Sequence, residues 1–394
     1  ILATHRVVGP QLPIRLTANN QLVRKAVDPA LLKSAARLAA EARRRQKLVR
    51  AWQFKSAHGI TSRKLATALR PLPQRPLAID FYVKWDDTSY PALKRALLKL
   101  DWVLPSWQSL EGPNLTLKRT LDNKALTLVP GTRPGVPILP VIQNEANDDW
   151  NGPGLQELLA DSARRAALEH EIVAFLAANK LQGIVVDFEE VPQGAYADLG
   201  TFFSELSMSF APHGWIVVQA APYDDDSWPY ASFAKVIDYT MLMAYDEHDE
   251  GSASGAIASE QWFETTLDKR MKVLAPNRTI IAIGNYAYDW NGGKTADELS
   301  FQDAAVAARD SDAQVDFDPD TNNPPFSYIE NNNVKHDIWF LDGVTAYNQI
   351  HAADVYRPAG YALWRLGSED PTTWSVFGRR YGATAPAALK EIPT

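Results

Sequence analysis

The chain has 394 residues, of which 46% are hydrophobic and 22% are charged, and this composition excludes an intrinsically disordered protein. Cysteine is absent, which excludes a disulfide framework, thiolate zinc sites and a cysteine nucleophile. The sequence contains no run of about 18 apolar residues, so it predicts no membrane-spanning helix.

Charge is distributed unevenly along the chain. Residues 1–76 hold 16 Lys or Arg against Asp28 and Glu41, a net charge of +14, whereas the remaining residues hold 24 bases and 45 acids. Residues 31–52 have apolar positions at helical spacing with bases opposite, which predicts an amphipathic helix. Such a helix is typical of a solvated protein surface, and a membrane surface or an acidic partner is the alternative.

The basic segment ends at a cluster of prolines, Pro71, Pro73 and Pro76. We therefore predict an N-terminal arm or linker over residues 1–76, a folded domain over 77–380 and a C-terminal tail over 381–394. The chain begins without Met and without the features of a signal peptide, so we interpret it as a fragment or processed form of a longer protein.

Beyond residue 76, short apolar runs alternate with longer helical stretches. The helical patterns include residues 162–180, with Asp161 as the expected N-cap, and residues 196–211. Alternation of this kind, eight times over, predicts an α/β fold in which the strands close a (β/α)8 TIM barrel. The eight predicted strands span residues 77–83, 101–107, 135–143, 183–189, 215–222, 239–246, 279–290 and 360–366.

The spacing between the last two strands is too long for one loop and one helix. About 69 residues separate Trp290 from Gly360, and the polar residues 330–333 lie between two aromatic, apolar runs, as in a hairpin turn. We therefore predict a small α+β insertion between strands 7 and 8, over about residues 291–357, that forms one wall of a cleft.

Polar residues that follow barrel strands are candidates for an active site. Asp187 and Glu189 end the fourth predicted strand two residues apart, so they share one face. Two carboxylates on one face suit a general acid with a raised pKa, and we expect Glu189 to titrate high and Asp187 low. The alternative is that both acids only cap the following helix.

Aromatic residues also gather at predicted strand ends. Tyr245 and Asp246 end the sixth strand, and Trp364 lies on the eighth; each could hold a polar substrate or belong to the core. A cleft lined by aromatic faces, as in carbohydrate-binding proteins, would explain the tryptophans that lie at or just after other strands, namely Trp85, Trp107, Trp150, Trp228 and Trp290.

Residues 182–189 resemble the D-G-x-D-x-D-x-E strand motif of glycoside hydrolase family 18. Tyr245 and Asp246 are similar to the M-x-Y-D strand of that family, and Trp364 to its strand-eight tryptophan. Residues 285–290, 337–340 and 364–371 resemble its bacterial branch, which includes spore-cortex hydrolases. The resemblance extends over residues 77–375, but Gln182 and Val185 replace the first two acids of the motif.

The resemblance implies a retaining, substrate-assisted hydrolase of a β-linked polysaccharide that contains N-acetylglucosamine. Glu189 would be the general acid/base, Asp187 would stabilise the substrate's acetamido group and Tyr245 would hydrogen-bond its oxygen. Loss of the acid at Val185 implies that other groups tune Asp187, or that catalysis is slower. The expected substrate-binding residues are Asp246, Trp364, Tyr288, Trp290, Gln219, Trp107 and Asn144.

We expect no cofactor and no metal, because the stretch around His248 offers one imidazole among acids. The acidic body argues against a nucleic-acid partner. Two alternatives stay open: a weak or inactive carbohydrate-binding barrel of the same family that serves exopolysaccharide synthesis, and a glucan hydrolase. The identity of the polymer is also open.

The chain further resembles the family 18 portion of bacterial membrane proteins that also carry polysaccharide deacetylase and glycosyltransferase domains. This resemblance implies an extracytoplasmic location, with a membrane tether upstream and the basic arm near the membrane. We expect the fragment itself to be monomeric.

Overall fold

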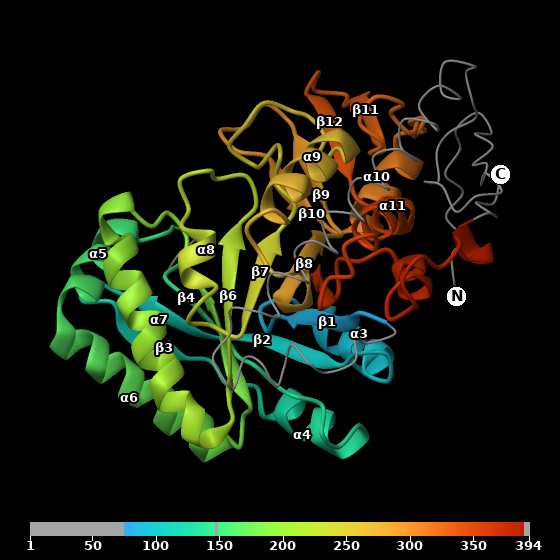
Figure 1. Cartoon of the computed structure of the whole chain (residues 1–394). Helices are drawn as coiled ribbons and strands as arrows, with labels where there is room; N and C mark the ends of the chain where they lie inside the picture. The colour runs from blue at the N-terminus through green and yellow to red at the C-terminus, as the bar shows by residue number, and fades with distance from the viewer. Residues whose placement is uncertain (1–74, 146–148, 390–394) are drawn as a thin grey trace.

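The structure is a computed structural model that describes residues 75–145 and 149–389. The predicted basic arm therefore lies outside the described residues, apart from its last two. Eight parallel strands form a barrel that closes because β1 pairs with both β13 and β2, as the sequence predicts (Figure 1). The barrel strands are β1 (Leu77–Tyr82), β2 (Trp102–Glu111), β4 (Val141–Gln143), β5 (Gly183–Asp187), β6 (Ile216–Pro222), β7 (Tyr239–Met243), β8 (Thr279–Gly284) and β13 (Gly360–Trp364).

Helices surround the barrel, and Figure 1 shows α5, α6 and α7 packed together on one side. Both helices singled out in the sequence are confirmed, and the Asp161 side chain caps α6 by accepting from the N–H groups of Ala163 and Arg164. No helix within the described ranges is long and apolar enough to span a bilayer. The helices are α3 (Ser89–Ala96), α4 (Asn123–Thr132), α5 (Gly152–Ala160), α6 (Ser162–Asn179), α7 (Tyr196–Phe210), α8 (Tyr230–Phe233), α9 (Glu260–Arg270) and α11 (Gly343–Ala353).

Apolar side chains fill the inside of the barrel. Val185, Val218 and Met241 are fully buried there, whereas the next residues along β5 and β7, Val186 and Leu242, face the surrounding helices. This alternation follows from the period of two in a strand. Because the interior is closed by this layer, any site must lie above it, at the carboxyl ends of the strands.

The predicted insertion is present as a second, antiparallel sheet in the order β10-β9-β12-β11. The hairpin of β11 and β12 is confirmed, and its turn is closed by the Glu330 N–H, which donates to the Val334 carbonyl over 2.9 Å. Figure 1 places this sheet beside α10 and α11. The elements of the insertion are β9 (Ala287–Trp290), β10 (Asp297–Leu299), α10 (Phe301–Asp310), β11 (Pro325–Ile329) and β12 (Lys335–Phe340).

The single strand predicted over residues 279–290 is wrong, because it is two strands in two sheets. Between them, the Asn285 N–H donates to the Trp364 carbonyl over 2.8 Å, and the Asn285 side-chain oxygen accepts from the Asp370 N–H. These bonds turn the chain out of the barrel, so the second sheet begins at Ala287 rather than after Trp290.

Both ends of the described chain are attached to the folded domain. The Arg75 guanidinium binds the Asp101 carboxylate at 2.6 and 2.9 Å, one residue before the boundary predicted at residue 76. Within the predicted tail, the Gly382 N–H donates to Asp354 over 2.6 Å and Leu389 is buried. A truncation that tests the predicted N-terminal boundary should therefore retain Arg75.

Candidate active site

Strand β5 carries two carboxylates to the mouth of the barrel. Asp187 is its last residue and lies on the inward face shared with the buried Val185, and Glu189 follows two residues later. The chain then leaves the strand direction at Glu190, which has a left-handed conformation with φ 49°. Asp187 is 5% exposed and Glu189 is half-buried, so both lie in a largely dry site.

Both carboxyl groups have raised pKa values. Burial raises the pKa of Asp187 to about 6, against the lowering effect of a hydrogen bond from Gln143 and with a further contribution from the Glu145 charge. Burial also raises the pKa of Glu189 well above its usual range, and the charges of Asp187 and Asp246 add to this effect. The expectation that Asp187 titrates low is therefore wrong, because burial outweighs its hydrogen bond.

Two neighbouring residues at the end of β4 hold this pair in place. The Gln143 amide donates to Asp187 Oδ2 over 3.0 Å. Asn144 is fully buried and its amide brackets the main chain of Glu189, donating to the carbonyl at 3.0 Å and accepting from the N–H at 2.9 Å. The prediction that Asn144 binds substrate is corrected to a positioning role, because its side chain is fully buried and its oxygen and one amide N–H bind the main chain of Glu189.

A second group of polar residues follows β7. The charges of Asp187, Asp246 and Glu189 all raise the pKa of Tyr245, after the larger effect of burial, so its hydroxyl stays protonated. Asp246 has a left-handed conformation with φ 62°, which ends the extended run of β7. Desolvation by the walls of the mouth raises the pKa of Asp246 to about 7.

Two tyrosines from the start of the insertion hold Asp246. The Tyr286 hydroxyl and the Tyr288 hydroxyl, the latter at 3.2 Å, both donate to Asp246 Oδ1. Tyr288 is only 7% exposed, so the structure places it as a support for Asp246. Sequence reasoning missed Tyr286 and Gln143, although Tyr286 lies two residues before the expected Tyr288 and Gln143 lies next to the expected Asn144.

Trp364 lies at the end of β13, between the barrel interior and an aromatic cluster of the insertion. Its indole is half-buried and meets the Phe81 ring edge to face at 5.0 Å. Trp290, on the same side of the insertion, donates from Nε1 to the Ser252 carbonyl over 2.9 Å. Gly284 permits the close approach of Tyr286 to the end of β8, since a Cβ there would lie 2.6 Å from the Tyr286 ring.

The comparisons with known proteins agree with this arrangement. The sequence model of Glycosyl hydrolases family 18 matches residues 124–369, which include both carboxylate-bearing strand ends and Trp364. The chain belongs to glycoside hydrolase family 18. It is therefore a glycoside hydrolase, and the barrel mouth that carries Asp187, Glu189, Tyr245 and Asp246 is the place where such chemistry would occur.

Two relatives come from Bacillus subtilis (strain 168). The "Uncharacterized glycosylase YvbX" is 26% identical over 244 residues, which cover 59% of this chain and 71% of that protein. A "Cortical fragment-lytic enzyme" is 24% identical over 289 residues, covering 69% of this chain and 64% of that protein. The chain thus spans about two thirds of the length of these relatives.

Solved structures show the same fold at low identity. The spore cortex-lytic enzyme SleL of Bacillus cereus superposes with a TM-score of 0.70 and 18% identity, covering 78% of this chain and 75% of that one. A chitinase of Chromobacterium violaceum ATCC 12472 gives a TM-score of 0.70 and 21% identity, covering 76% and 97%.

The two residues that replace acids of the family motif lie at different depths in the barrel. Gln182 is exposed at the start of β5 and accepts from the Ile138 N–H over 2.9 Å, far from the mouth. Val185 is fully buried in the interior layer below Asp187. The pKa of Asp187 is therefore set mainly by burial, and then by the neighbouring Gln143 and Glu145.

Two predicted substrate-binding residues face outward, toward the helices that surround the barrel. Trp107 is 1% exposed within the cluster between barrel and helices, because it shares the outward face of β2 with Val103, four residues earlier. Gln219 lies between the outward-facing Val217 and Ala221 on β6. Neither side chain reaches the mouth of the barrel, and both predictions are wrong for that reason.

Proposed function

We propose that this family 18 hydrolase cleaves a β-linked polysaccharide containing N-acetylglucosamine, with retention of anomeric configuration. The observation that carries the proposal is a group of three carboxyl groups and a tyrosine at the barrel mouth: burial, with the charges of Asp187 and Asp246, raises the pKa of Glu189, and the pKa of Tyr245 is raised as well. A protonated carboxyl in a dry site is what a general acid requires.

In the proposed reaction, Glu189 donates its proton to the glycosidic oxygen while the acetamido oxygen of the substrate attacks the anomeric carbon. The C–O bond to the leaving sugar breaks and a cyclic oxazolinium ion forms. Water then opens this ion, giving its proton to the Glu189 carboxylate. No protein nucleophile is needed, because the substrate supplies it.

The neighbouring residues stabilise the charge that develops. Asp187, held by Gln143, faces the positive acetamido group, and the Tyr245 hydroxyl donates to the acetamido oxygen. Asp246 binds hydroxyl groups of the sugar at the cleavage point with the oxygen that its two tyrosines leave free. The Trp364 face lies below this sugar.

The polymer itself is best tested with a panel of substrates. We would incubate wild-type protein with chitin oligosaccharides, partly deacetylated glucosamine polymer, peptidoglycan and a β-glucan, and analyse the products by mass spectrometry. Peptidoglycan is included because relatives are named for lysis of spore cortex. We expect cleavage only next to N-acetylated sugars; cleavage of the glucan would overturn the proposal.

The location of the enzyme is a separate proposal. We propose that it acts outside the cytoplasmic membrane, on polysaccharide, with the basic residues 1–76 near a membrane. This location can be tested by fusing the natural full-length gene product to a fluorescent protein that fluoresces only in the cytoplasm. Fluorescence of the fusion would contradict the proposal.

A further inference from the structure

We propose that Arg365 is a positioning residue of the active site, whose guanidinium joins three segments at the mouth of the barrel and sets their distance from the sugar over Trp364. This inference rests on the proposed function and adds to it a residue that acts through others. Arg365 directly follows Trp364 at the end of β13, and its side chain is only 13% exposed.

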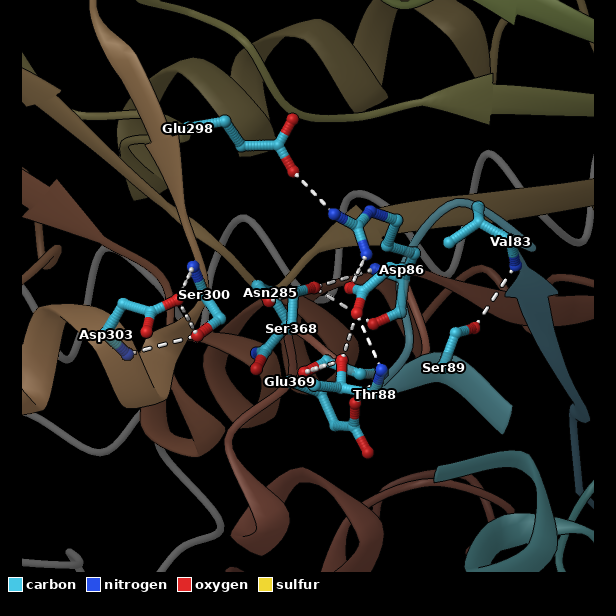
Figure 2. Close-up of polar contacts among 12 residues, drawn as sticks. Val83, Asp86, Thr88, Ser89, Asn285, Glu298, Ser300, Asp303, Ser368 and Glu369 are labelled. Atoms are coloured by element: carbon cyan, nitrogen blue, oxygen red, sulfur yellow. Dashed lines mark hydrogen bonds and ion pairs between the residues drawn. The ribbon is translucent and has the colours of Figure 1, made fainter. Parts of the chain in front are cut away.

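The Arg365 guanidinium binds two carboxylates that belong to different parts of the fold (Figure 2). One nitrogen binds Asp86, in the loop between β1 and α3, and the second lies 3.3 Å from Glu298 Oε1 on β10 of the insertion. A guanidinium is a planar fork with several donors, so it can hold two acids at fixed positions, whereas a lysine ammonium is a single point charge. The first βα loop and the insertion are therefore connected through this one side chain.

Asp86 is itself held in place on its own loop. Its Oδ1 accepts from the Thr88 N–H over 2.8 Å and from the Thr88 hydroxyl over 2.5 Å. Desolvation raises the pKa of Asp86, but the bonds from Thr88 and the ion pair with Arg365 outweigh this effect and lower the pKa below its usual value. Asp86 therefore stays ionised, as the partner of an arginine should.

The loop of Asp86 also approaches the segment that follows Arg365. Gly367 has φ +103°, and a Cβ there would lie 2.4 Å from Thr88 Oγ1, so only glycine permits this approach. The ion pair between Asp86 and Arg365 thus joins two segments that already lie in contact.

Glu298 connects Arg365 to the residues that hold Asp246. It lies opposite Tyr288 in the pairing of β10 with β9, and antiparallel partners face the same side of a sheet. The Tyr288 hydroxyl donates to Asp246 over 3.2 Å. Burial is the largest cause of the raised pKa values of Asp246 and Tyr288, and the charge of Glu298 adds to both. The carboxylate that Arg365 binds is therefore close to the group that we expect to bind the sugar at the cleavage point.

The main chain around Arg365 has a fixed position. The Asn285 N–H donates to the Trp364 carbonyl over 2.8 Å, and the buried Ser368 hydroxyl lies 3.0 Å from the carbonyls of both Asn285 and Arg365. From this fixed point, the Arg365 side chain sets how far the first loop and the insertion lie from Trp364.

Removal of the guanidinium should loosen the mouth of the barrel at this point. Asp86 and Glu298 would lose the cation between them, and two like charges in a partly buried site repel each other. The sugar over Trp364 would then be held in a less defined position. Since a misplacement of about 1 Å can cost about 100-fold in rate, the effect should fall on catalysis at the cleavage point more than on binding of the rest of the polymer.

The test compares Arg365→Met with wild type on the hexamer of β-1,4-linked N-acetylglucosamine. We expect kcat to fall about 10- to 100-fold, while KM changes less than about 3-fold. Arg365→Lys should recover part of kcat, because lysine can still bind one of the two acids. In the double variant Arg365→Met/Glu298→Gln, kcat should be no lower than in Arg365→Met, since both substitutions remove the same contact.

The matched control is Arg165→Met. Arg165 also forms a largely buried ion pair, with Glu205 at 2.9 Å, but this pair joins α6 to α7 on the outside of the barrel. Its loss should affect stability and leave kcat equal to that of wild type. A fall in kcat of equal size in Arg165→Met would show that loss of any buried ion pair has this effect, and would overturn the role of Arg365.

Binding of an intermediate analogue separates positioning from a loss of folded protein. A thiazoline analogue of the cyclic oxazolinium ion occupies the cleavage point alone. Calorimetry should show that Arg365→Met binds it about 10- to 100-fold more weakly than wild type does, in parallel with the fall in kcat. Partial unfolding would instead reduce the number of binding sites and leave the dissociation constant unchanged, which would overturn the inference.

The same measurements distinguish this inference from the proposed function. If wild type neither hydrolyses the hexamer nor binds the analogue, the proposed function fails, and the role of Arg365 fails with it. If wild type does both and Arg365→Met has the wild-type kcat and affinity, only the role of Arg365 is overturned. Should Arg365→Met not fold, Glu298→Gln breaks one of the two ion pairs and should show the same losses at smaller size; wild-type values in that variant would overturn the inference.

Discussion

Two carboxylate pairs in this barrel have raised pKa values for the same physical reasons, and only one can act on a substrate. Asp187 and Glu189 face inward at the mouth, beside Tyr245. Asp80 faces outward from β1, where full burial and the charge of Glu369 raise its pKa well above the usual range. A raised pKa therefore indicates that a carboxyl group is buried. A catalytic carboxyl group must in addition be accessible from the mouth of the barrel.

The largest effect should come from Glu189→Gln, which removes the transferable proton. We expect kcat to fall by about 10²- to 10⁴-fold, the usual contribution of a general acid, while substrate is still bound. The control is Glu190→Gln, which alters the exposed neighbouring acid and should keep most of the activity. Substantial hydrolysis by Glu189→Gln would assign the proton donor elsewhere.

Asp187→Asn should have the second largest effect. We expect kcat to fall by about 10²-fold through loss of stabilisation of the acetamido charge. Because the Asp187 charge helps to raise the pKa of Glu189, its removal should lower that pKa and move the basic limb of the pH–rate profile to lower pH. The two groups titrate as a coupled pair, so the whole profile must be compared. An unmoved basic limb would contradict this coupling.

Trp364→Ala tests whether the half-buried indole binds substrate. We expect about 10-fold weaker oligosaccharide binding, measured by calorimetry. The loss in free energy of unfolding should be less than the about 3–5 kcal/mol that truncation of a fully packed tryptophan costs. A stability loss of that full size with unchanged affinity would show that Trp364 only packs against Phe81.

Asp80→Asn should have the smallest effect on activity and a clear effect on stability. Folded Asp80 stays protonated above the pH at which the unfolded chain releases its proton, near 4, so wild type loses stability as pH rises. The stability gain of the variant should therefore be absent below about pH 4 and grow by about 1.4 kcal/mol per pH unit above it, up to the pKa of folded Asp80. Unfolding by denaturant at several pH values measures this gain, and a gain independent of pH would refute it.

Much of the fold could be predicted because it depends on local patterns. The apolar runs, the cap at Asp161 and the polar turn at 330–333 are local, and each is confirmed. The pair Asp187 and Glu189 could be found because residues two apart share one face of a strand.

The errors concern long-range pairing. Both faces of a barrel strand are buried, so an apolar run such as that around Gln219 does not reveal which face is inward. On β2, the apolar run over residues 101–107 likewise does not reveal that Trp107 lies on the outward face with Val103. The occupied amide of Asn144 depends on a contact 45 residues away.

The central claim is that Glu189 and Asp187 support a retaining reaction in which the substrate supplies the nucleophile. Proton NMR of the first products from an N-acetylglucosamine oligosaccharide, recorded before mutarotation, tests it most directly. We expect the new reducing end to appear first as the β-anomer. An α-anomer as the first product would mean that water attacks directly, and the roles assigned to Asp187 and Glu189 would be wrong.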